Sequence, residues 1–121
     1  MTYRRLLLLK FVACLGGAPV LLLAPRWFYG VVGIPAGTAV LPARAYGAVL
    51  AGTVLLTWFA RNVGARDARR AILLHLLVYD AAGALVTFLG LSSREVNALA
   101  WPIFGVYLFF AVGAAAVLRE G

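Results

Sequence analysis

Four long apolar segments dominate this chain and limit the folds that it can adopt. Their approximate limits are residues 6–23, 43–60, 71–91 and 98–118, and the third of them holds no Arg, Lys or Glu. A helix needs about 20 apolar residues to cross a bilayer, with a range of about 17–25. None of the segments alternates between apolar and polar residues as a membrane β-strand does. The sequence therefore predicts an all-α integral membrane protein with four transmembrane helices.

The composition argues against several other classes of protein. Hydrophobic residues make up 64% of the chain and charged residues 12%, whereas soluble domains are about half apolar and a quarter charged. The net charge of +7 does not indicate a nucleic-acid partner, because the basic residues lie at the ends of the apolar segments. Cys14 is the single cysteine, which excludes an intrachain disulfide and a cysteine metal cluster. We expect a single transmembrane domain over residues 1–121.

The distribution of the basic residues predicts how the chain is oriented. If the N-terminus is cytoplasmic, eight basic residues lie on or near the cytoplasmic side, and Arg26, Arg44 and Arg94 lie outside. The short connection at residues 92–97 predicts that the third and fourth helices are antiparallel neighbours. The Ala-, Arg-, Leu- and Gly-rich composition is typical of a GC-rich bacterium. The prediction is an antiparallel four-helix bundle in the bacterial cytoplasmic (inner) membrane, with both termini cytoplasmic.

The connection between the first two segments, residues 24–42, is long and rich in proline. Pro25, Pro35 and Pro42 prevent it from forming one continuous helix. We expect this connection to lie on the outer surface or to fold back between the helices.

Asp80 is the one acidic residue near the middle of an apolar segment. An ionised Asp at that depth costs roughly 2.5–3.5 kcal/mol. Asp80 should therefore face the interior of the bundle and be either protonated or paired. Candidate partners on the other segments are Thr53, Tyr107 and Lys10, whose long side chain extends its reach. Together with the neighbouring Tyr79, these residues form either a ligand site or a polar clasp between helices.

His75 completes the set of candidate residues and raises a separate hypothesis. It shares a helix face with Tyr79, whereas Asp80 points about 140° away from it. Ala71, four residues earlier, leaves space for a flat macrocycle, so that haem or bacteriochlorophyll could bind at His75. The alternative is a neutral packing residue that bonds to a backbone carbonyl or to Tyr. No other cofactor and no metal site is predicted.

Two stretches resemble parts of a known group of proteins. They are LLLAPRWFYGVVGIP, Leu21–Pro35, and ARAYGAVLAGTVLLTWFARN, Ala43–Asn62; a basic pair, Arg69–Arg70, precedes the third segment. They resemble the end of the first helix with its following loop, and the second helix, of small bacterial four-helix membrane proteins of the DoxX-like kind. The resemblance implies the four-helix architecture and supplies no catalytic or binding residues.

Two functions are compatible with these observations. The chain has no phosphate-binding loop, metal-ligand spacing or nucleophile with a nearby base, so an enzyme is not expected. Gly- and Ala-rich helix faces suit close packing against other membrane subunits or a second copy of the chain. We therefore predict a non-enzymatic accessory or structural subunit. The alternative is a binder or carrier of a lipophilic molecule (a quinone, lipid or pigment) at a midplane site around Asp80, which requires a cavity there.

Overall fold

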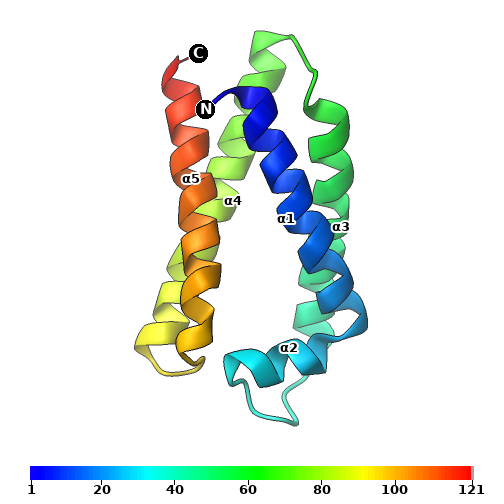
Figure 1. Ribbon diagram of the computed structural model, residues 1–121, viewed down its shortest axis with the longest axis vertical. Coiled ribbons are helices and arrows are strands. Elements are labelled where there is room, and N and C mark those ends of the chain that lie inside the picture. The colour runs from blue at the N-terminus through cyan, green and yellow to red at the C-terminus, as the bar shows by residue number, and fades with distance from the viewer. Residues whose placement is uncertain (121) are drawn as a thin grey trace.

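The computed structural model describes residues 1–120, and most of these residues are helical. Its elements are α1 (Tyr3–Leu23), α2 (Pro25–Val32), α3 (Leu41–Ala60), α4 (Arg66–Ser92), the short 3-10 helix η1 (Ala98–Ala100) and α5 (Trp101–Glu120) (Figure 1). Helices α1, α3 and α4, and η1 together with α5, are long and apolar enough to cross a membrane. This confirms the prediction of an all-helical chain with four such helices.

The helices extend beyond the apolar segments from which they were predicted. Helix α1 begins at Tyr3, where the side chain of Thr2 accepts a hydrogen bond of 3.3 Å from the Arg5 backbone N–H. Helix α4 begins at Arg66, before the first apolar residues of its segment, and Asp67 in its first turn suits the helix dipole. Arg and Ala are strong helix formers. Hydropathy therefore marks the part of each helix that suits lipid rather than its ends.

The connection at residues 24–42 contains a helix, α2, that the sequence analysis did not predict. Pro25 occupies its first turn, where a missing backbone N–H costs nothing. Gly33 ends the helix in the left-handed conformation, with φ of 82°. The backbone N–H of Asn97 donates to the Val32 carbonyl over 2.7 Å, and the Asn97 side-chain amide donates to the Val31 carbonyl over 3.0 Å. These bonds tie the end of α2 to the segment that precedes α5.

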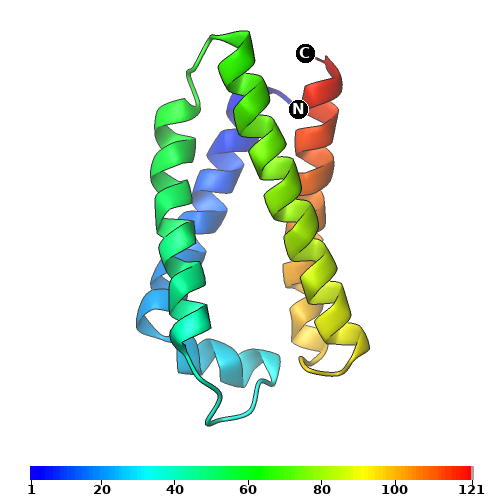
Figure 2. The ribbon, with the colours of Figure 1, turned by 180° about the vertical axis from the view of Figure 1, so that it is seen from behind.

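The four long helices are arranged as two pairs. Helix α1 packs mainly against α3, and α4 against α5. Both ribbon views show the two pairs diverging from the end that holds the termini towards the end that α2 crosses (Figures 1 and 2). Within the first pair, Gly47 permits close approach, because a Cβ atom there would lie 3.1 Å from the backbone nitrogen of Leu22.

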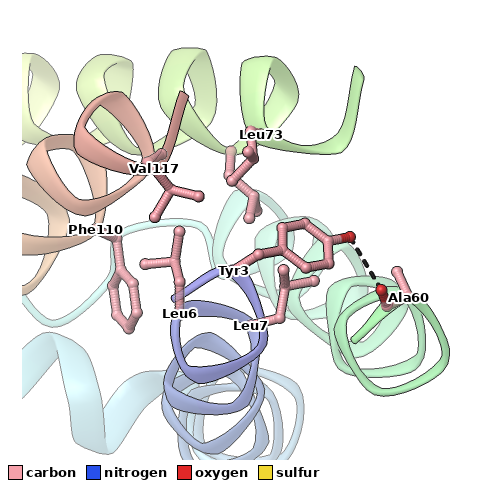
Figure 3. Close-up of a cluster of buried hydrophobic side chains, with 9 residues drawn as sticks. Tyr3, Leu6, Leu7, Ala60, Leu73, Phe110 and Val117 are labelled. Atoms are coloured by element: carbon pink, nitrogen blue, oxygen red, sulfur yellow. Dashed lines mark hydrogen bonds between the residues drawn. The ribbon is translucent and has the colours of Figure 1, made fainter. Parts of the chain in front are cut away.

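A cluster of buried side chains joins the two pairs at the end where they converge. All four long helices contribute to it, through Tyr3, Leu6, Leu7, Ala60, Leu73, Leu76, Phe110, Ala114 and Val117 (Figure 3). The Tyr3 hydroxyl donates a hydrogen bond of 2.9 Å to the Ala60 carbonyl, which attaches the start of α1 to the end of α3. In lipid, such packing contributes through van der Waals contact rather than through exclusion of water. The pairs are thus held together at one end, and more open at the other.

Candidate functional site

A buried ion pair links the two helix pairs below the converging end. The Lys10 ammonium on α1 donates a hydrogen bond to Oδ1 of Asp80 on α4. Both residues are almost fully buried, with exposed fractions of 3% for Lys10 and 0% for Asp80. Asp80 therefore faces the interior, as its desolvation cost requires, and Lys10 is the partner among the three candidates. The second carboxylate oxygen of Asp80, Oδ2, has no hydrogen-bond partner among the described residues.

Aromatic rings surround the Lys10 ammonium and take the place of water around it. The nitrogen lies 4.6 Å from the ring centre of Tyr79, 4.8 Å from that of Phe110 and 6.0 Å from that of Tyr107. The negative face of an aromatic ring attracts a cation at such distances. Lys10 is therefore held inside the protein.

Three tyrosine hydroxyls form a connected layer next to this ion pair. Tyr79 on α4 donates a hydrogen bond of 2.9 Å to the hydroxyl of Tyr46 on α3. The Tyr46 hydroxyl is also hydrogen-bonded to that of Tyr107 on α5. The layer, defined as Tyr46, Tyr79 and Tyr107, therefore spans both helix pairs. Tyr107 fits there because it lies against Gly83, where a Cβ atom would come within 2.4 Å of its ring.

A cavity of about 690 Å³ lies between the diverging helix pairs. Its wall is mostly apolar and comes from the end of α1, from α2, the start of α3, the second half of α4 and the first half of α5. All three tyrosines of the layer line the cavity. Because Tyr79 adjoins Asp80 in sequence and contacts Lys10, the layer is the part of the wall nearest the ion pair. Among the described lining residues, Glu95 is the only charged one.

Two of the candidate residues lie apart from this arrangement. Thr53 is buried, but its hydroxyl donates to the Val49 carbonyl of its own helix over 2.8 Å. A hydroxyl that bonds back in this way is satisfied locally. His75 is exposed on the outer surface of α4, and its ring centre is 5.9 Å from that of Tyr79. Neither residue is hydrogen-bonded to Asp80 in the described structure.

Tyr46 is the residue of the tyrosine layer that the sequence analysis did not select. It precedes Thr53 by seven residues, a spacing that places both on one face of α3. That spacing is the feature of the sequence that could have identified Tyr46 as a site residue. Tyr46 lies near the start of its helix, where an aromatic residue is usually interpreted as an anchor at the membrane interface.

No protein-family model matches this chain, and no curated protein or solved structure shows significant similarity to it. The interpretation of the site therefore depends on its own residues. Together they combine an apolar cavity, a layer of hydroxyl groups and a charge-neutral ion pair.

Proposed function

We propose that the protein binds a lipophilic small molecule, such as a quinone, lipid or pigment, in the cavity between its helix pairs. The observation that supports this most directly is the cavity of about 690 Å³ with the tyrosine layer in its wall. Sites for small molecules typically have volumes of about 300–1,000 Å³, with apolar walls and a few polar groups that orient the ligand. This cavity has both properties, and it lies beside the Asp80 ion pair rather than around Asp80 itself.

The ion pair has a supporting role in this proposal. Lys10 and Asp80 connect α1 to α4, and the Lys10 ammonium lies over the ring of Tyr79. The pair therefore fixes the spacing of the two helix pairs beside the cavity and positions one tyrosine of the layer. In this proposal, the polar clasp and the ligand site, which the sequence left as alternatives, are parts of one arrangement.

The test is native mass spectrometry on protein gently extracted from its own membranes. We expect an added small mass on the wild-type protein and its loss in Ile103→Trp, because the larger side chain would fill the cavity that Ile103 lines. Leu108→Trp is the matched control, since Leu108 lies on the same helix, is 45% exposed and does not line the cavity. Equal retention of the mass by both variants would contradict the proposed location.

An accessory or structural subunit is a second candidate, and the outward-facing glycines favour it. Gly16, Gly52 and Gly105 are exposed on three different helices, and a Cβ atom at any of them would meet nothing within 4 Å. Small residues on lipid-facing surfaces allow another helix to approach closely. In the same mass spectrometry experiment, co-migrating protein chains without a small mass would favour this function over ligand binding.

We also propose that the chain is a four-helix membrane protein of the DoxX-like kind. Its helices would form an antiparallel bundle in a bacterial cytoplasmic membrane, with both termini cytoplasmic. The excess of basic residues at the terminal end supports this orientation. Single cysteines at Ala39 and Gly64, introduced into Cys14→Ala protein, would test it in whole cells. An impermeant maleimide should label the first and not the second. The reverse pattern would require the opposite orientation.

A further inference from the structure

The tyrosine layer contains more hydrogen-bond donors than its own bonds use. Three phenol hydroxyls carry three O–H donors, and two hydrogen bonds connect them. Tyr79 donates to Tyr46, and either Tyr46 or Tyr107 donates in the second bond. In both cases one O–H group, on Tyr46 or on Tyr107, has no acceptor among the described residues. Asp80 Oδ2 does not serve as that acceptor, because it is itself without a partner.

This remaining donor belongs to a residue that lines the cavity. The Tyr46 and Tyr107 hydroxyls are partly buried and hydrogen-bonded to each other, so the remaining O–H is a donor that an acceptor on a ligand can still use. Tyr46 and Tyr107 both line the cavity, so an acceptor placed inside it can reach the O–H group. A purely hydrocarbon occupant would leave the donor unsatisfied.

The charges around the cavity exclude an anionic head group as the best match. Glu95 is the only charged residue among the described lining residues, and it is an acid. Lys10, the cation that contacts the tyrosine layer, is already neutralised by Asp80 and covered by aromatic rings. An anion placed against the layer would therefore lose its hydration without gaining a positive partner.

We infer that the ligand is a neutral lipophile whose head group carries a hydrogen-bond acceptor, such as a ring carbonyl. The head group binds against Tyr46 and Tyr107, and the apolar body extends along the cavity towards α2. This inference rests on the proposed function and specifies the chemistry of its ligand. The inference is argued from the number of hydroxyl groups and their hydrogen bonds, whereas the proposed function is argued from the cavity.

The test compares three probes of similar shape on the full-length protein in lipid nanodiscs. Decyl-benzoquinone offers neutral acceptors, decylbenzene offers none, and decylbenzoate is anionic. Apparent Kd values are corrected for partition into empty nanodiscs. We expect the quinone to bind wild-type protein at least about fivefold more tightly than decylbenzene, which is the effect of one satisfied neutral hydrogen bond. Decylbenzoate should bind more weakly than the quinone.

Two tyrosine variants attribute this preference to the layer. Y3F is the matched control, because Tyr3 donates to the Ala60 carbonyl and does not line the cavity, so the preference should persist. The triple variant Y46F/Y79F/Y107F removes every hydroxyl and should bind the quinone and decylbenzene equally. A triple variant that keeps the full preference would overturn the assignment to the layer.

The comparison of the three probes on wild-type protein tests the inference even if the triple variant does not fold. Equal affinity for the quinone and decylbenzene would overturn the inference and leave the proposed function standing. Tighter binding of decylbenzoate would overturn the neutrality of the head group. Binding of none of the probes would count against the proposed function itself.

Discussion

Replacing Asp80 by Asn is expected to destabilise the protein by about 3–5 kcal/mol. The Lys10 ammonium would then lie in the interior without a counter-charge, because both side chains are almost fully buried. Replacing both residues, as Lys10→Met with Asp80→Leu, should recover most of this loss, since a well-packed apolar pair avoids desolvating two charges. The free energy of unfolding can be measured by titrating detergent-solubilised protein with sodium dodecyl sulfate and following the circular dichroism.

The single variants Lys10→Met and Asp80→Leu form, with the double variant, a thermodynamic cycle that isolates the interaction. A large coupling free energy between Lys10 and Asp80 is the expected result. If Asp80→Asn unfolds as the wild type does, Lys10 must reach the membrane surface instead, as lysines near helix ends commonly do. In that case the ion pair would not connect the helix pairs.

Gly83→Ala should cost about 1–3 kcal/mol, the usual range for overpacking a close contact. The added Cβ would lie 2.4 Å from the Tyr107 ring, so that the ring must move. Movement of Tyr107 would also break the hydrogen bond between its hydroxyl and that of Tyr46. We therefore expect reduced binding of the lipophilic ligand together with reduced stability, measured by the unfolding titration and by native mass spectrometry.

Gly105→Ala is the matched control for this prediction. Gly105 is exposed on α5, and a Cβ atom there would meet nothing within 4 Å. An Ala within a helix is favoured over Gly by about 0.5–1 kcal/mol, so this variant should be neutral or slightly stabilised. Equal effects of Gly83→Ala and Gly105→Ala would show that the contact between Gly83 and Tyr107 does not constrain the layer.

The inward position of Asp80 could be predicted from the sequence, but its partner could not. The cost of a charge in lipid holds for any arrangement of the helices and directs Asp80 inward. Thr53, Tyr107 and Lys10 were all acceptable partners by position. Which of them pairs with Asp80 depends on which helices approach each other at that depth. The Thr53 hydroxyl does not pair with Asp80, because it donates to the backbone of its own helix.

The sequence analysis names Tyr79 and Tyr107 but not Tyr46, and it does not predict helix α2, for related reasons. Tyr46 is near the start of its helix, and it meets Tyr79 and Tyr107 only because two helix pairs bring α3, α4 and α5 together around the cavity. Prolines argue against one continuous helix over residues 24–42, although Pro25 suits the start of a short one. Local patterns indicate what a segment tolerates, and they do not specify its neighbours.

The residues of each segment are sufficient to determine that four helices of this chain suit a bilayer. The free energy of transferring a helix into lipid is nearly a sum over its own side chains, so the information is local. The cavity and the meeting of the Lys10–Asp80 pair with the tyrosine layer arise from packing between segments far apart in the chain. Packing depends on the shapes of several helices at once, and for that reason no single segment encodes it.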